Sequence, residues 1–148
     1  MEIENLKELI DYGVLGVLGF MGFLALWAYI ERLIFFFRID LRKYKYKEEL
    51  DIDLTKNITI ISSVGSNAPY VGLLGTVLGI IITFYLLGSG GDVSATKIMK
   101  SLSLALKATA LGLVVAIPAM LFYNHIIRKI EVLQKKWEIL QKDGDKKI

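Results

Sequence analysis

Long apolar stretches set the pattern of this chain. A bilayer core of about 30 Å needs roughly 20 apolar helical residues to cross it. Three stretches reach that length, and they cover residues 12–30, 68–88 and 102–123. The first two contain no charged side chain, and Lys107 is the only one in the third. The pattern predicts an all-α membrane protein with three transmembrane helices.

The polar segments between the spans also carry helical patterns. Residues 31–50 mix apolar and basic side chains without Pro or Gly, which predicts that the first helix continues past the bilayer. Residues 51–55 interrupt that pattern, and we expect the chain to turn back there. Apolar residues then recur at helical spacing, which predicts a short helix that runs into the second span. They are Ile58, Ile61, Val64 and Ala68.

The tail after residue 123 continues the third helix. Its apolar residues step by three and four, which is a short heptad seam. They are Ile126, Ile130, Leu133, Trp137 and Leu140. We expect this seam to help hold neighbouring subunits together, because two repeats are too few to form a coiled coil alone.

Basic residues are concentrated on one side of the predicted membrane. Segments 31–67 and 124–148 hold seven Lys and Arg each, whereas segments 1–11 and 89–101 hold three together. Positive charge stays on the cytoplasmic side. We therefore expect the amino terminus outside and the carboxyl terminus in the cytoplasm. Because the leader is acidic and no small-x-small site follows the first span, we expect an uncleaved anchor rather than a signal peptide.

Composition narrows the class of function. The formal net charge of +3 arises from the basic residues at the membrane edges, so it does not indicate nucleic-acid binding. The chain has no cysteine and a single histidine, His125, which we expect at the cytoplasmic interface. It also has no phosphate-binding GxxxxGK[ST] loop. We expect no enzyme activity, no metal site and no cofactor.

Small and hydroxyl residues within the spans are the remaining candidates. Helix packing is indicated by Gly72, Gly75 and Gly79 in the second span and by Gly112 in a stripe of small residues in the third. Pro69 and Pro118 mark a kink or a first helical turn. Counted from the span ends, Thr83 and Thr109 come to similar depth, with Thr76 about 10 Å closer to the cytoplasm. Each threonine either bonds its own i−4 carbonyl or lines a shared lumen.

Lys107 allows two interpretations. A lysine near the middle of a bilayer costs about 2.5–3.5 kcal/mol, and such charges are usually functional. Lys107 lies roughly 7–8 Å inside the predicted outer end of its span, a distance that its aliphatic stem can reach across. It is therefore either an anchor at the membrane surface or a charge facing a pore.

Two of these spans resemble the ExbB/TolQ/MotA proton-channel family. Residues 68–80 (APYVGLLGTVLGI) are similar to that family's APxxGLLGTVxGI signature. Residues 107–124 contain the Ala-Thr-Ala, Ala-Ile-Pro-Ala and Tyr-Asn elements of its second signature, in the same order. Span order and the cytoplasmic tail also agree over about residues 12–141.

The resemblance implies a homopentamer in the bacterial inner membrane, with the second and third spans lining a central pore. Residues 1–11 and 89–101 then face the periplasm. Transmembrane helices of an ExbD-like or TolR-like partner lie in the pore, and movement passes to a TonB-like or TolA-like protein. Thr76 and Thr109 match the family's pore threonines, and Thr83 falls where relatives often carry a small polar residue.

One departure from the family bears on mechanism. Many relatives have a glutamate five residues before the threonine of the second signature, and here that residue is Leu104, while Lys107 stands where an aliphatic residue is common. No Asp or Glu lies in the three predicted spans. Threonine does not titrate near neutral pH. The hypothesis is that a partner helix supplies the proton-carrying carboxylate, while Thr76, Thr83 and Thr109 provide hydrogen bonds.

The sequence thus predicts an ExbB-like subunit of a proton-motive-force-driven motor that energises transport across the outer membrane. A TolQ-like subunit of an envelope-constriction system is the nearest rival, and a non-conducting membrane scaffold is another. The short cytoplasmic segment favours ExbB over MotA, whose relatives carry a much larger cytoplasmic domain.

Overall fold

A computed structural model describes residues 2–90 and 94–146, so residues 91–93 of the predicted 89–101 loop lie outside the described part of the chain. The elements in order are α1 (Glu2–Arg38), the 3₁₀ turn η1 (Leu41–Lys43), α2 (Lys47–Leu54), α3 (Ile58–Gly88) and α4 (Ala95–Lys146). The described residues contain no strand. The all-α prediction is confirmed.

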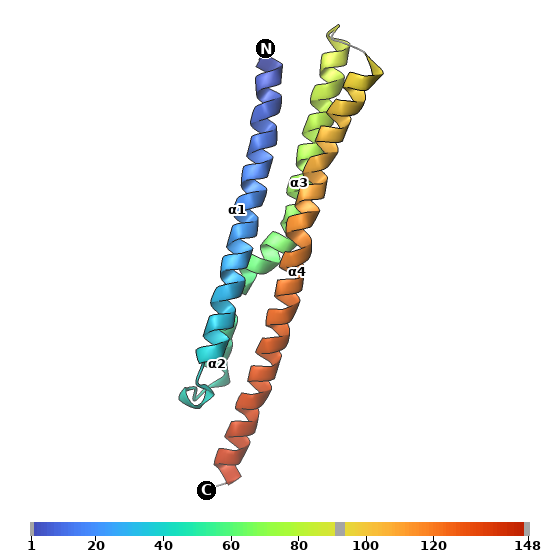
Figure 1. The fold of residues 1–148 in the computed structure, drawn as a ribbon. Helices are drawn as coiled ribbons and strands as arrows, with labels where there is room; N and C mark the ends of the chain where they lie inside the picture. The colour runs from blue at the N-terminus through green and yellow to red at the C-terminus, as the bar shows by residue number, and fades with distance from the viewer. Residues whose placement is uncertain (1, 91–93, 147–148) are drawn as a thin grey trace.

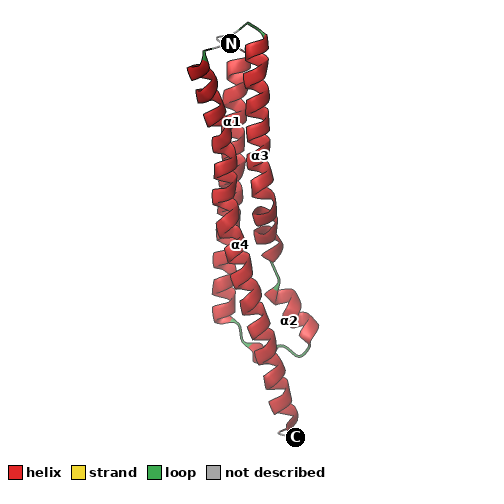
Figure 2. Ribbon diagram, turned by 90° about the vertical axis from the view of Figure 1, so that its right-hand side faces the viewer, coloured by secondary structure: helices red, strands yellow, loops and turns green. Residues whose placement is uncertain are grey.

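Three of these helices, α1, α3 and α4, are long and apolar enough to cross a membrane. They lie side by side over the upper part of an elongated molecule, with α3 and α4 joined at the end near the amino terminus (Figure 1, Figure 2). The most extensive packing is between α3 and α4. One buried cluster at this level combines side chains of all three long helices, namely Leu18, Ala25, Val64, Ala68, Ala116 and Ala119.

The predicted helix leading into the second span is confirmed. Helix α3 runs without interruption from Ile58 through Pro69, and Ile61, Val64 and Ala68 are buried. Its first turns lie at an angle to the remainder of the helix (Figure 1). Proline inside a helix removes one backbone hydrogen bond and clashes with the preceding turn, which is a common cause of such a bend.

The prediction that the first helix continues to residue 50 is wrong, because α1 ends at Arg38. Asp40 adopts an extended conformation, and its carboxylate accepts a 3.0 Å hydrogen bond from the Arg42 amide, which starts η1. The predicted turn at 51–55 is also misplaced, since residues up to Leu54 are helical in α2. The chain turns at 55–57, where Asn57 has a left-handed backbone with φ 67°.

The apolar seam of the tail packs largely within its own chain. Ile126 and Ile130 are buried in a cluster with residues of α1, α2 and α3, and Leu133 and Trp137 pack against that cluster. The Trp137 indole donates a 3.0 Å hydrogen bond to the Tyr44 carbonyl. The expectation that this seam holds subunits together is therefore wrong for the buried Ile126 and Ile130, and it stays a prediction for Leu133, Trp137 and Leu140. The seam followed from helical spacing alone, which does not identify the packing partner.

A buried arginine joins the end of α1 to the end of α2. Arg32 is 1% exposed, and its guanidinium donates to both carboxylate oxygens of Glu31 at 2.6 and 2.7 Å. It also donates to the carbonyls of Asp53 and Leu54 at 2.6 and 3.3 Å. These are carbonyls of the last turn of α2, where the helix dipole favours a cation. The carboxyl-terminal end of α1 is thus attached to α2 by a fully paired charge.

Candidate functional site

A pair of threonine hydroxyls lies in the contact between α3 and α4. Thr76 Oγ1 is hydrogen-bonded to Thr109 Oγ1, and it lies 2.8 Å from the Ala105 carbonyl oxygen on α4. A hydroxyl has one proton and two lone pairs. All bonds are satisfied when Thr109 donates to Thr76 and Thr76 donates to the carbonyl. Thr76 is 6% exposed, and Thr109 is half-buried. The two spans therefore share a small polar site inside an apolar contact.

Glycine brings the two helices close enough for this bond. A Cβ atom added at Gly72 would lie 2.6 Å from the Ala108 carbonyl oxygen, and one added at Gly112 would lie 2.7 Å from the Ala68 carbonyl oxygen. Both are contacts with backbone, which cannot rotate away. Gly75 and Gly79 extend the same contact, each with an α4 alanine methyl that would lie 2.8 Å from an added Cβ atom. The glycines predicted to pack helices lie on the face that carries Thr76.

The depth assignment made from the sequence is wrong. Thr76, rather than Thr83, lies opposite Thr109. The prediction counted inward from residue 102, but α4 begins at Ala95. The seven additional residues shift Thr109 by about two turns, or roughly 10 Å, relative to the end of α3. Residues 95–101 are too polar for a predicted span, yet they are helical.

Thr83 stands apart from this pair. It is 4% exposed, and its hydroxyl donates a 2.9 Å hydrogen bond to the Gly79 carbonyl of its own helix. It lies seven residues along α3 from Thr76, which is about 10 Å. The structure therefore brings Thr76 and Thr109 together and leaves Thr83 two turns away. Its hydrogen bond to the i−4 carbonyl is the one expected of a threonine that only packs.

Lys107 lies on a different face of α4 from Thr109. Residues two positions apart in sequence, such as Lys107 and Thr109, are separated by about 200° around the helix axis. Lys107 lines a cavity of about 80 Å³ between α1 and α4, together with Asp11. The structure thus places it at the same cavity as a carboxylate of α1, without an ion pair between the two among the described residues, and away from the threonine pair. Sequence reasoning missed Asp11 because it counted that residue only as part of an acidic leader.

Two other polar groups lie where α1 approaches its carboxyl-terminal end beside α4. Tyr29 Oη and His125 Nδ1 are 2.7 Å apart, and the Tyr29 ring stacks on Phe122 with ring centroids 4.3 Å apart. His125 thus links α1 to α4. Among the described residues, no group of three or more His, Cys, Asp or Glu side chains could hold a metal ion.

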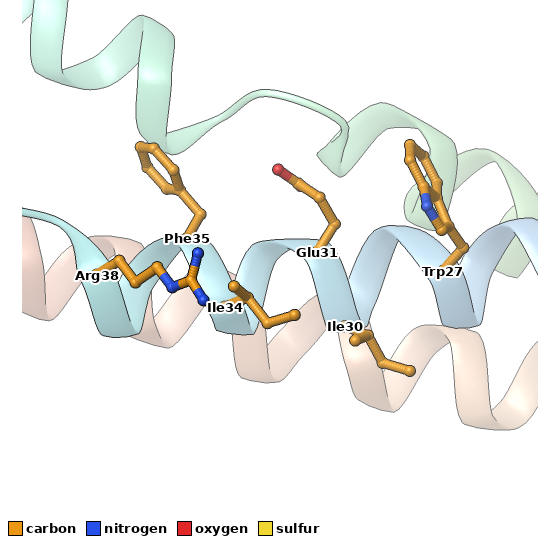
Figure 3. Close-up of a pocket in the computed structure, with 6 residues that line it drawn as sticks. All are labelled: Trp27, Ile30, Glu31, Ile34, Phe35 and Arg38. Carbon is orange, nitrogen blue, oxygen red and sulfur yellow. The ribbon is translucent and has the colours of Figure 1, made fainter.

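A hollow of about 470 Å³ lies on α1 below these residues, lined by Trp27, Ile30, Glu31, Ile34, Phe35 and Arg38 (Figure 3). Trp27, Glu31 and Phe35 extend toward the α2–α3 segment (Figure 3). Glu31 is already bonded to Arg32 and accepts a 3.2 Å hydrogen bond from the Asn57 amide. The hollow therefore offers apolar surface, and Arg38 is its one charged lining residue without an ion pair among the described residues.

Comparison with known proteins identifies the family. Residues 40–139 match the MotA/TolQ/ExbB proton channel family. The chain belongs to this family. The matched region of this family member includes α2, α3 and most of α4, and so both threonines of the pair.

The matched relatives extend over nearly the whole of this family member. It is 54% identical over 136 residues to a biopolymer transport protein ExbB of Helicobacter pylori, which covers 92% of this chain and 94% of the relative. It is 51% identical over 138 residues to ExbB of Aquifex aeolicus, covering 93% of each. A putative ExbB-like protein 2 of Helicobacter pylori is 46% identical over 140 residues, with 95% and 93% covered. With its three apolar helices, this family member is a multi-pass membrane transport protein of ExbB type.

Proposed function

We propose that this protein is the ExbB-like subunit of a proton-motive-force-driven motor in the bacterial inner membrane. With ExbD-like and TonB-like partners it energises active transport across the outer membrane. The ExbB names of its relatives support this role over the TolQ-like alternative. The Thr76–Thr109 hydroxyl pair, buried where the two pore-forming spans meet, is the observation that carries the proposal.

The assembly proposed is a homopentamer with a periplasmic amino terminus and a cytoplasmic carboxyl terminus. Spans at 12–30, 68–88 and 102–123 lie within the longer helices α1, α3 and α4. The fourteen basic residues of segments 31–67 and 124–148 support this orientation. Helices of the ExbD-like partner occupy the pore, beside α3 and α4.

The proton step requires a group that titrates, and the three spans contain no Asp or Glu. A carboxylate on the partner's helix fills that role in the proposal. The half-buried Thr109 hydroxyl, whose proton is donated to Thr76, offers lone pairs that accept a hydrogen bond from that group when it is protonated, and Thr83 is a secondary position nearer the periplasm. Each proton that crosses releases about 2.3 kcal/mol per 100 mV of membrane potential, which is enough to shift the packing of one helix.

We propose that the Lys107 ammonium group is stabilised by the Asp11 carboxylate and has no role at the threonine pair. Both side chains line the same small cavity between α1 and α4. An opposite charge nearby lowers the cost of keeping an ammonium within the membrane. This favours the anchor interpretation of Lys107 over a charge facing the pore.

Reconstitution tests the proposal. The protein is co-expressed with an ExbD-like protein, purified as a complex and placed in vesicles that carry a pH-sensitive dye. We expect proton uptake when a potential is applied, and its loss in the complex that carries Thr109→Val. Uptake equal to that of empty vesicles in the wild-type complex would support the scaffold alternative. Unchanged uptake in the variant would remove the threonine pair from the path.

A further inference from the structure

A groove of about 640 Å³ separates the last turns of α1 from α4, at the cytoplasmic end of the predicted spans. Its lining is apolar on one side and basic on the other. The residues are Leu33, Phe36, Phe37, His125, Arg128, Lys129, Val132, Leu133 and Lys136. No acidic residue lines it, which sets it apart from the neighbouring hollow on α1.

One residue of the apolar wall, Phe37, is unusually exposed for its chemistry, whereas Phe36 beside it is buried. Phe37 has 91% of its surface exposed, although it is the last apolar residue of α1. It lies seven residues, or about 10 Å, beyond the predicted end of the first span. A phenyl ring that remains in water loses most of the free energy gained on burial, so such a surface usually contacts apolar material. That distance places Phe37 among the lipid headgroups, where the apolar material available is the headgroup end of an acyl chain drawn into the groove.

The basic wall carries two lysines that form no ion pair among the described residues. Lys129 and Lys136 lie seven residues apart on α4, hence on one face and about 10 Å from each other. Neither takes part in the ion pairs found among the described residues, whereas Arg128 has a 3.6 Å contact with Glu131. Ammonium groups at the edge of an apolar groove match the phosphate of a lipid whose chains enter that groove.

We propose that this groove binds one anionic phospholipid of the cytoplasmic leaflet. The phosphate lies between Lys129 and Lys136, and one acyl chain lies along the exposed ring of Phe37. The lipid would fix the level at which α4 leaves the membrane. This inference requires that the chain spans the membrane in the proposed orientation, and it does not depend on proton conduction.

Native mass spectrometry of the detergent-purified assembly tests the proposal. The assembly is mixed with equal amounts of phosphatidylglycerol and phosphatidylcholine that share the same acyl chains. We expect the wild type to retain phosphatidylglycerol preferentially. In the variant Lys129→Gln/Lys136→Gln the affinity for phosphatidylglycerol should fall about 30-fold, because each basic side chain near an anionic surface contributes roughly a factor of five.

A matched control removes the same charge from the same helix outside the groove. The variant Lys135→Gln/Lys142→Gln should keep the wild-type preference, since neither lysine lines the groove. Phe37→Ala should lower retention of both lipids, because it removes apolar surface from the wall. Millimolar inorganic phosphate should not displace the lipid.

Four results would overturn the inference. Equal retention of the two lipids by the wild type would show that the groove does not select charge. An equal fall in the two lysine variants would show a general effect of net charge. Displacement by inorganic phosphate would indicate a site for a free anion. A groove that retains no lipid because a second copy of the chain or an acidic protein segment fills it would also contradict the proposal.

Discussion

Replacing Thr109 with valine separates the structural role of its hydroxyl from the proposed functional one. Valine has nearly the same shape, so the helix contact is kept and only the hydroxyl is lost. Thr76 still donates to the Ala105 carbonyl at 2.8 Å, and no polar atom of Thr76 is left without a partner. Interhelical hydrogen bonds in membranes contribute about 0.6 kcal/mol on average and at most about 1.7 kcal/mol. The variant should therefore fold and assemble.

Loss of function should be far larger than this structural cost. If the hydroxyl pair serves the proton path, proton-motive-force-dependent uptake across the outer membrane should fall to the background of a deletion strain. The assay measures uptake of a labelled substrate in cells that make the partners, with the amount of assembled complex checked in parallel. Thr109→Ser keeps a hydroxyl and should retain most uptake.

Thr83→Val supplies the matched control on α3. It removes an equally buried threonine hydroxyl, but one bonded only within its own helix. We expect it to retain more uptake than Thr109→Val at the same level of complex. Wild-type uptake in Thr109→Val would refute the role assigned to the pair. A loss of assembled complex in Thr109→Val as large as its loss of uptake would show that the hydroxyl only holds the helices together.

Three further predictions follow from the packing and the charges. Gly72→Ala places a methyl group 2.6 Å from a backbone oxygen of α4, so it should destabilise the assembly by about 1–3 kcal/mol in detergent-melting experiments, whereas Gly19→Ala, which meets open space, should change little. Lys107→Met should leave proton flow intact but lower thermal stability, and the exchange Asp11→Lys/Lys107→Asp should restore it; loss of flow with unchanged stability would contradict the anchor role. Burial and a neighbouring carboxylate raise the pKa of Tyr44 to about 12. The neutral phenol therefore stabilises the fold fully below pH 10, and this stabilisation is lost as the pH rises through 12. Melting curves of Tyr44→Phe should lack that alkaline decline.

The sequence was sufficient to predict the three long helices, but it did not predict α2 or the contacts between the helices. Apolar length and helical spacing identify α1, α3 and α4, because these depend on the local chain and the bilayer. Which residues of α3 and α4 lie at the same level depends on where each helix begins. Helix α4 begins at Ala95, and its first two turns are too polar to be recognised from apolar residues. Hence Thr83, instead of Thr76, was assigned to the level of Thr109.

Contacts between distant segments were equally hard to predict. The tail seam around Ile130 has the spacing of a subunit contact, yet it packs on its own chain because η1 and α2 return to it. Asp11 and Lys107 are 96 positions apart, and only the packing of α1 on α4 places them at one cavity. The Asp40 side chain ended α1 through a local hydrogen bond that apolar patterning does not detect.

Helix α4 continues for 52 residues without a break, from Ala95 to Lys146. From Thr109 to its last residue the helix is about 55 Å long. A tilt of about 10° at the level of Thr109 would move the far end by roughly 10 Å. A small change in the packing at the threonine pair would in this way become a large sideways movement at the carboxyl-terminal end of α4. Pro118 lies nine residues along this lever and provides a point at which its stiffness can change.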